Sequence, residues 1–221
     1  MIGPGRWTGI VTGLRQEAAI AGALGRAAAG GGRKGGAEAA ARLLADAGAD
    51  ALLSFGLAGG LDPSLPPGTL LVPRVVLDQD EQFFTDPGLA AQLGGGIDAP
   101  LLAVPNIVAR MEEKRRLHQA TRAASVDQES GAVARVAAQR GLPFAVLRAV
   151  CDPAWRSLPH AALVALRPDG SLDVPGLLSS LARRPGDLPA LLALARDAVQ
   201  ARKALVGRVH QIGRGGGLLV A

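Results

Sequence analysis

The chain has 221 residues, of which 48% are hydrophobic, and it carries no internal repeat, so it suits one compact α/β domain with an ample core. Only 3% of the residues are aromatic and Tyr is absent, which argues against nucleic-acid binding by base stacking. The net charge of +5 comes mainly from scattered Arg residues. We therefore expect a general positive surface, attracted to an anionic membrane surface more readily than to a polyanion.

The single cysteine, Cys151, excludes an intramolecular disulfide and indicates a reducing compartment. The start MIGPGRWTG lacks a charged segment followed by an apolar one, and no apolar run is long enough to span a bilayer. We expect a cytoplasmic protein, soluble or peripheral to the inner membrane face. We expect neither a dinucleotide nor a metal, because no G-x-G-x-x-G follows the first predicted strand and no cluster of metal ligands is evident.

The first half of the chain alternates apolar segments with alanine-rich ones. We predict strands over Trp7–Gly13, Ala51–Phe55 and Thr69–Leu77, and helices over Gln16–Ala29 and Ala37–Ala47. The segment GLAGG at 56–60 is predicted to turn, and its small residues would let backbone N–H groups approach a ligand. Residues 78–96 are irregular and contain Phe83 and Phe84. They form either a mobile flap over an apolar ligand or a surface loop anchored by two aromatics.

The middle of the chain combines buried-strand signals with charged residues. We predict a strand over Leu101–Val104, an exposed helix over Glu112–Ala120 with a solvated His118, a helix over Glu129–Arg140 and a strand over Phe144–Val150. Arg148 interrupts this last strand, and a buried guanidinium is costly unless it is paired or faces a cavity. Asp152 follows at the carboxyl end, where α/β sheets collect ligands. From the residues alone, the favoured interpretation is structural: Asp127 and Glu129 are carboxylates at a helix N-terminus, and Asp152 is a turn residue.

Beyond Asp152 the sequence becomes helical. We predict helices with broad apolar faces over Ala161–Leu166, Val174–Arg183 and Leu188–Leu205, separated by Pro-Asp-Gly and Arg-Pro-Gly-Asp turns. Residues 156–207 would form a helical extension of a domain that spans 1–207. Residues 208–221 are expected to be a flexible tail.

Three blocks of the sequence resemble the purine nucleoside phosphorylase and methylthioadenosine/S-adenosylhomocysteine nucleosidase superfamily. VDQES at 126–130 and PFAVLRAVCD at 143–152 resemble the pattern VDMES … P-F-x-x-x-R-x-x-S-D, and Glu129 and Asp152 are 23 residues apart. GIVTGLRQEAAIAG at 9–22 resembles the family's opening strand and loop, and SFGLAGGLDPSLPPGTLLVP at 54–73 resembles its G-x-A-G-G-L … G-D-L-V-V block. Together and in order the blocks are specific. The resemblance implies a single-domain, three-layer α/β fold with a central mixed sheet flanked by helices.

The resemblance also implies cleavage of the N-glycosidic bond of a purine nucleoside, through a cationic sugar and an increasingly anionic base. It makes Asp152 the general acid toward the base and has Glu17 and Arg148 position the nucleophile. The remaining implied contacts are Glu129 and Gln128 to ribose, Gly13, Arg15, Leu57, Ala58 and Gly59 to the nucleophile or phosphate, and Asn106, Ile107 and Cys151 to the base.

Three positions depart from the family pattern. Gln128 replaces the usual Met and brings a polar group to an apolar contact, while Cys151 replaces Ser before Asp152 and is a poorer hydrogen-bond donor. Thr69 stands in place of an acidic residue. None of the three changes removes one of the candidate carboxylates.

The helical extension, with the DPA sequence after the last strand, resembles the hopanoid-associated nucleoside phosphorylases, which are thought to release adenine from adenosylhopane. A bulky apolar 5′ substituent would give the extension a physical use, since burial contributes about 25 cal/mol per Å². Alternatively, these helices only cover the sheet. Other candidate functions are a methylthioadenosine/S-adenosylhomocysteine nucleosidase, a classical purine nucleoside phosphorylase and a non-catalytic scaffold. We expect phosphate as a candidate co-substrate, no other cofactor, and a homo-oligomer.

Overall fold

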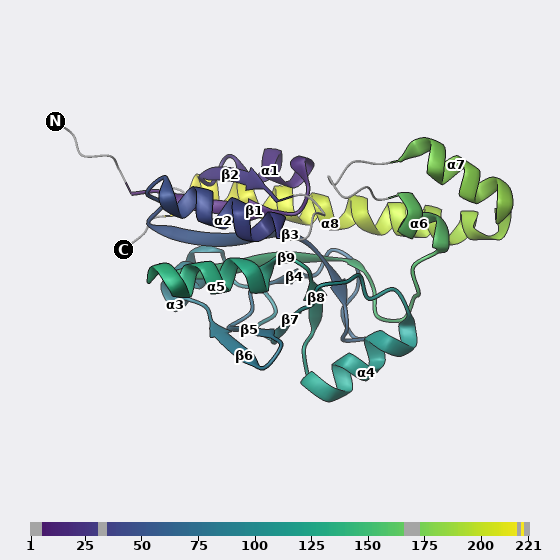
Figure 1. The fold of residues 1–221 in the computed structure, drawn as a ribbon, viewed down its shortest axis with the longest axis horizontal. Helices are drawn as coiled ribbons and strands as arrows, with labels where there is room; N and C mark the ends of the chain where they lie inside the picture. The colour runs from purple at the N-terminus through teal and green to yellow at the C-terminus, as the bar shows by residue number, and fades with distance from the viewer. Residues whose placement is uncertain (1–5, 31–34, 166–172, 216–217, 219–221) are drawn as a thin grey trace.

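The structure is a computed structural model that describes residues 6–30, 35–165, 173–215 and 218 (Figure 1). Its strands are β1 (Thr8–Thr12), β2 (Arg26–Ala29), β3 (Ala51–Gly60), β4 (Leu70–Leu71), β5 (Val75–Asp78), β6 (Glu81–Phe84), β7 (Leu101–Ala103), β8 (Ser125–Asp127) and β9 (Phe144–Asp152). Its helices are α1 (Arg15–Ala21), α2 (Gly36–Asp46), α3 (Pro87–Gln92), α4 (Met111–Thr121), α5 (Ser130–Arg140), α6 (His160–Ala165), α7 (Val174–Arg183) and α8 (Leu188–Arg214).

The strands of the described residues form one mixed nine-stranded sheet. The order β2-β1-β3-β8-β7-β5-β6 forms the main path, and β9 pairs with both β3 and β4. The long parallel pairing of β3 with β9 runs from Leu52 opposite Phe144 to Ala58 opposite Val150. The end of β3 pairs antiparallel with β8, where Gly59 lies opposite Val126. The carboxyl ends of β3 and β9 therefore lie side by side, and the short strand β8 lies along the end of β3.

Apolar side chains alternate between the two faces of the sheet and make two separate cores. On one face, Ile10, Leu53 and Leu147 pack with α1, α3 and α8; on the other, Val11, Leu52 and Val146 pack with α2 and α5. A strand buried on both faces is mostly apolar, as the β9 sequence is apart from Arg148 and the terminal Asp152. The predicted single-domain, three-layer α/β fold with a central mixed sheet is confirmed.

The predicted helix over Gln16–Ala29 is wrong beyond Ala21. Helix α1 ends there, and Arg26–Ala29 form the edge strand β2, parallel to β1. A Cβ on Gly25 would collide with the backbone carbonyl of Thr8. Alanine favours helix locally, but pairing with β1 decides the conformation of this segment.

The region between residues 69 and 96 also differs from the prediction. The strand expected over Thr69–Leu77 is divided into β4 and β5, which lie on either side of Pro73. The segment predicted to be irregular contains β6, which forms a hairpin with β5, and α3, whose N-terminus is capped by the Asp86 carboxylate bonded to the Leu89 amide at 2.8 Å. Phe84 is 75% exposed. The segment is therefore mostly regular structure.

Two strands are longer than predicted and, besides β2 and β6, a third strand was missed. Strand β3 continues through the glycine-rich segment to Gly60, and β9 continues to Asp152. Strand β8 has only three residues and was not predicted. Hydrogen bonding between β3 and its neighbours stabilises the glycine-rich segment as a strand, although Gly disfavours strands locally.

The helical extension projects from the sheet as α6, α7 and the first half of α8, at the right of Figure 1. Helix α8 does not end at Leu205 but continues to Arg214, so the prediction of a flexible tail is wrong for residues 208–214. Its second half is held because Val209 and Ile212 continue the buried stripe begun by Ala201. The last residue of the predicted helix Ala161–Leu166 lies outside the described residues. No helix in the described ranges is long and apolar enough to cross a membrane.

Candidate active site

A cavity of about 640 Å³ lies at the carboxyl ends of β3, β8 and β9 and extends toward the projecting helices. Except for Arg15, the predicted site residues line this cavity: Gly13, Glu17, Leu57, Ala58, Gly59, Asn106, Ile107, Gln128, Glu129, Arg148, Cys151 and Asp152. Arg15 is exposed and is not among the lining residues. Its position therefore does not support the predicted contact with phosphate.

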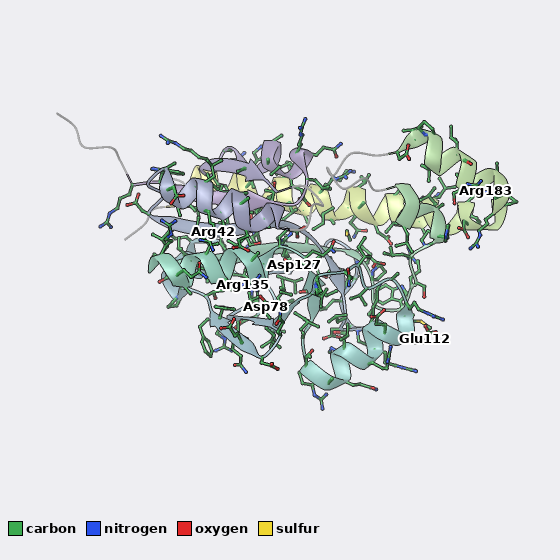
Figure 2. All side chains as sticks on the ribbon, in the orientation of Figure 1. Arg42, Asp78, Glu112, Asp127, Arg135 and Arg183 are labelled. Carbon is green, nitrogen blue, oxygen red and sulfur yellow. The ribbon has the colours of Figure 1, made fainter. Side chains whose placement is uncertain are left out.

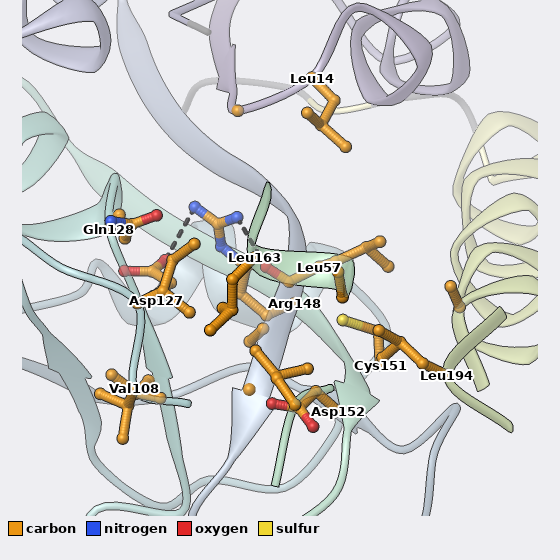
Figure 3. A pocket seen from close by; sticks show the side chains of 18 of the residues that line it. Leu14, Leu57, Val108, Asp127, Gln128, Arg148, Cys151, Asp152, Leu163 and Leu194 are labelled. Atoms are coloured by element: carbon orange, nitrogen blue, oxygen red, sulfur yellow. Dashed lines mark hydrogen bonds and ion pairs between the residues drawn. The ribbon is translucent and has the colours of Figure 1, made fainter. Parts of the chain in front are cut away.

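Arg148 occupies the centre of the polar end and is 1% exposed. Its Nη2 lies 2.8 Å from Oδ2 of Asp127 and 3.2 Å from Oε2 of Glu129, and its Nη1 donates to the Leu57 carbonyl at 3.1 Å. Figure 3 shows the guanidinium between Asp127 and Leu57. Ser54 also accepts from Nη2, at 2.8 Å. The guanidinium is thus paired within the protein, which resolves the cost of placing it inside a buried strand.

The charges around Arg148 influence one another strongly. Burial alone would lower the pKa of Arg148, but the carboxylates of Asp127, Glu129 and Glu17 outweigh burial and raise it. Burial is also the main cause that raises the pKa of Glu129 to about 7, with Arg148 opposing the rise and Asp127 and Glu17 adding to it. Glu129 therefore changes charge near neutral pH.

Glu17 is 3% exposed and is held by two backbone amides. Its Oε2 accepts from the Leu14 amide at 2.8 Å, and its Oε1 accepts from the Leu57 amide at 2.9 Å. The backbone beside it has no room for a side chain at Gly56, where φ is +150° and a Cβ would lie 2.8 Å from both Glu17 Oε1 and Arg148 Nη1. The glycine-rich strand end therefore allows two charged groups to approach the backbone closely.

Asp152 lies at the end of β9 and is 6% exposed. Its Oδ2 is 2.6 Å from Nζ of Lys114, a residue of α4 that is 0% exposed. Burial raises the pKa of Asp152 above its ordinary value, while Lys114 opposes the rise. Burial also raises the pKa of the neighbouring Cys151 thiol to about 12, with Asp152 adding to the rise. The thiol is therefore a neutral group beside the candidate acid at neutral pH.

The segment expected to contact the base lies at the edge of the cavity. Ile107 is 43% exposed, and Gln128 is exposed, although both residues line the cavity. The Gln128 amide donates to the Pro105 carbonyl at 3.1 Å. This hydrogen bond gives the Gln128 amide a polar partner at a position where the family pattern has an apolar Met.

The other end of the cavity is apolar and is formed by the projecting helices. Its lining residues there are Leu158, Ala162, Leu163, Leu177, Leu191, Leu192, Leu194, Ala195, Ala198 and Val199. Figure 3 places Leu194 and Leu163 in the same cavity as Arg148 and Asp152. One continuous space therefore connects buried carboxylates to a leucine-rich wall.

Several functional groups were missed by sequence reasoning. Asp127 was predicted only as a helix-capping residue, and Oδ1 does accept from the Ser130 amide at 3.1 Å, but its Oδ2 pairs with Arg148. The Ser130 hydroxyl also bonds to Asp127 and lies 2.9 Å from that of Ser54. Lys114 was predicted to lie on an exposed helix, which is wrong for this residue. Lys114 is the one buried residue of α4. The charged residues on either side of it in the sequence gave no apolar stripe from which its burial could be predicted.

His118 is half-buried rather than fully solvated, and its Nδ1 lies 2.8 Å from the Ala123 carbonyl. It is not among the cavity-lining residues. Among the described residues, no group of three or more His, Cys, Asp or Glu side chains is placed to hold a metal ion.

Solved structures with a similar fold include an S-adenosylhomocysteine nucleosidase from Streptococcus pyogenes in complex with 5-methylthiotubericidin. It is 16% identical, with a TM-score of 0.65, and the match covers 95% of this chain and 98% of that chain. A Helicobacter pylori methylthioadenosine nucleosidase mutant with 5′-methylthioadenosine in its active site is 17% identical, with a TM-score of 0.66 and coverage of 94% and 100%. A methylthioadenosine/S-adenosylhomocysteine nucleosidase from Colwellia psychrerythraea in complex with adenine is 17% identical, with a TM-score of 0.62 and coverage of 93% and 96%. At these identities the likeness shows the fold.

No curated protein matches the chain in sequence. The family model described as the phosphorylase superfamily matches residues 30–92 and 98–171, which is more than half of the 221 residues. The chain belongs to the phosphorylase superfamily and is an enzyme that cleaves glycosidic bonds.

Proposed function

We propose that this enzyme hydrolyses the N-glycosidic bond of an adenine nucleoside whose 5′ substituent is a large hydrocarbon, as in adenosylhopane. The observation that carries this proposal is the single cavity that joins the Arg148 carboxylate cluster, formed by Asp127, Glu129 and Glu17 around Arg148, to the leucine-rich wall of the projecting helices. A nucleoside with an apolar 5′ group matches this cavity, because its polar ribose would lie at the charged end and its 5′ group at the leucine-rich end.

In this mechanism Asp152 is the acid that protonates the leaving base. Its burial, which raises its pKa, favours the protonated form that a general acid requires. Glu129 accepts hydrogen bonds from the ribose hydroxyls and places negative charge near the cationic sugar. Bond cleavage moves the electrons of the C–N bond to the base, which takes the proton from Asp152. The oxygen of the attacking water bonds to the anomeric carbon and its proton passes to the Glu17 carboxylate, so that the free sugar and the neutral base are the products.

Water is the better candidate nucleophile than phosphate. The Arg148 carboxylate cluster contains three carboxyl groups and one guanidinium, and that guanidinium is already paired within the protein. An incoming phosphate anion would be repelled by the three carboxyl groups. Arg15 is exposed and lies outside the cavity, which leaves Arg202 of α8 as the lining arginine other than Arg148. Glu17 is held by two backbone amides and is suited to orient a water molecule at the anomeric carbon.

The size and lining of the apolar end favour a large 5′ substituent. Leucines from α6, α7 and α8 face this part of the cavity, and a buried hydrocarbon gains about 25 cal/mol per Å² of apolar surface. A methylthioadenosine/S-adenosylhomocysteine nucleosidase is the second candidate. It is favoured by the fold likeness to nucleosidases, including a Helicobacter pylori enzyme solved with butyl-thio-DADMe-Immucillin-A.

We further propose that the tip of the extension contacts an anionic lipid surface, where a hydrocarbon-bearing substrate would reside. Leu178 is 61% exposed and Leu188 is 46% exposed, and the cations Arg183 and Arg184 lie nearby in the sequence and are also exposed. Figure 2 shows Arg183 at the far end of this extension. Exposed leucines beside arginines suit an anionic interface. We expect the protein to sediment with anionic vesicles but not with neutral ones. Leu178→Asp should reduce the fraction of protein that sediments.

The deciding experiment is adenine release from adenosylhopane and from methylthioadenosine, each with and without phosphate, with the sugar product identified by mass. Phosphate-independent release from adenosylhopane with a free sugar product is the expected result. Release only from methylthioadenosine would favour the second candidate, and a sugar phosphate product would establish phosphorolysis. No release from either nucleoside would overturn both candidates and direct the search to other nucleosides. Light scattering of the same sample tests the proposed homo-oligomer.

A further inference from the structure

Lys114 is a buried cation that the proposed reaction does not yet use. It is 0% exposed on α4, a helix whose other charged residues are exposed or half-buried. Its Nζ lies 2.6 Å from Asp152 Oδ2, 3.0 Å from the Pro153 carbonyl and 2.9 Å from the Arg156 carbonyl. An ammonium has three N–H donors, and here each donor has one acceptor. The group is therefore fixed in position by its complete set of partners.

The two oxygens of Asp152 are consequently different. Oδ2 accepts from Lys114, whereas no donor among the described residues bonds to Oδ1, and the side chain lines the cavity. A carboxyl that protonates a base needs one oxygen directed to the base and a fixed orientation. The contact with Lys114 supplies that orientation.

We propose that Lys114 is a positioning residue for Asp152, which holds Oδ2, leaves Oδ1 for the base and sets the pH range over which the carboxyl can donate a proton. This inference rests on the proposed function only in giving Asp152 the role of acid. The pairing itself is independent of which nucleoside binds. Without the ammonium, a buried carboxyl would retain its proton to higher pH.

Two other charged groups influence the pKa of Asp152 in opposite directions. Arg156, in the loop after β9, favours the ionised form, while Asp197 of α8 disfavours it. These two residues pair with each other at 2.6 Å, so their influences on Asp152 oppose one another. The adjacent Cys151 is a neutral thiol, because its pKa is raised to about 12. Lys114 is thus the cation in direct contact with the carboxyl.

A Lys114 that only anchors the fold can be told from one that positions Asp152. Its hydrogen bonds also tie α4 to the loop that contains Pro153 and Arg156, so its removal would lower stability under both roles. A loss of anchoring lowers the rate at every pH. A loss of the ammonium also moves the alkaline limb of the pH profile.

The test compares kcat/KM of Lys114→Met and of the wild-type enzyme, measured by adenine release over roughly pH 5 to 10, where most side chains titrate. We expect the alkaline limb of Lys114→Met to move to higher pH by about 1–3 units, the range an opposite charge at this separation produces. Lys114→Gln, which retains an N–H donor but no charge, should move the limb in the same direction and serves if the Met variant does not fold. The control is Arg135→Met, which removes the ion pair with Asp78 outside the cavity and should leave the limb in place.

A second readout does not depend on catalysis. Carboxyl ¹³C NMR of protein labelled at aspartate, with the Asp152 signal assigned through Asp152→Asn, measures the pKa of Asp152 in the ligand-free enzyme. The same upward shift in Lys114→Met is expected. An unchanged Asp152 titration in a folded Lys114 variant would overturn the inference. If the wild-type enzyme cleaves neither nucleoside, the proposed function fails while the NMR titration still decides the role of Lys114.

Discussion

Nη2 of Arg148 lies 2.8 Å from Oδ2 of Asp127, and both side chains are 1% exposed. The contact joins the middle of β9 to the end of β8, two strands that each pair with β3. Glu129, two residues beyond Asp127, shares the same guanidinium at 3.2 Å. The orientation of the proposed ribose contact therefore depends on an ion pair deep in the fold.

Replacing Arg148 with Met should lower the free energy of unfolding by about 3–5 kcal/mol, because the change leaves buried carboxylates without their cation. Urea denaturation followed by circular dichroism measures the loss. Arg42→Ala is a suitable control, since Arg42 forms a half-exposed pair with Glu38 and its removal should cost less than about 1 kcal/mol. A loss as small as that of the control would show that the carboxylates do not need Arg148.

Asp152→Asn and Glu129→Gln should each reduce turnover by at least about two orders of magnitude, the range attributed to a positioned acid or base. Each variant keeps the size of the side chain and removes its proton-transfer or charge function. Steady-state adenine release measures the effect, and Glu112→Gln on the exposed side of α4 is the control. Rates close to wild type in both variants would remove these residues from the mechanism.

The raised pKa of Glu129 predicts that the difference in stability between the wild-type protein and Glu129→Gln depends on pH. The carboxyl titrates near 4.5 when unfolded and at about 7 when folded, so the folded state binds more protons between these values. The free energy of unfolding consequently falls as the pH rises through this window, by up to about 3 kcal/mol from this group. Glu129→Gln lacks the effect. Its melting temperature relative to wild type should rise from about pH 4.5 to about pH 7 and then level off, whereas a constant difference would contradict the assignment.

The apolar end of the cavity predicts a selective effect on substrate affinity. Leu194→Asp should raise the KM for a nucleoside with a hydrocarbon 5′ group at least about tenfold, since one buried leucine contact is worth about 1.5–3 kcal/mol. The KM for methylthioadenosine should change less, because its 5′ group is short. Leu178→Asp is the matched control in detergent solution, as Leu178 is 61% exposed and does not line the cavity. Equal changes for both nucleosides would argue against an apolar 5′ subsite.

Gly56→Ala should reduce both stability and turnover. The new Cβ would lie 2.8 Å from both Glu17 and Arg148, closer than Cβ atoms ordinarily approach other groups, and φ at this position is +150°. Thermal unfolding and adenine release measure the two effects. The control is Gly186→Ala, where a Cβ would meet no atom within 4 Å. Tolerance of Ala at position 56 would mean that the glycine-rich strand end can relax without disturbing the site.

Local sequence patterns carried much of the fold because they coincide with tertiary demands. The apolar run Phe144–Val150 is a strand buried on both faces, and the segment after Asp127 is a helix that ends at Gly141. The predictions failed where pairing overrides propensity. The alanine-rich segment Arg26–Ala29 became the edge strand β2, and the glycine-rich segment after Phe55 continued as part of β3.

By itself, the sequence determined the α/β class, because its apolar and alanine-rich segments alternate in chain order. Residue types and spacing did not single out Glu17, Glu129, Arg148 and Asp152 as site residues; their match to the motifs of a known family did, and all four line one cavity. Only the tertiary structure decided their partners. The pairing of Asp127 with Arg148 and of Lys114 with Asp152 joins residues 21 and 38 positions apart, and no periodic pattern encodes which buried charge meets which. Burial and pairing, rather than residue type, also decided that Arg148 is held within the protein and Arg15 lies outside the cavity.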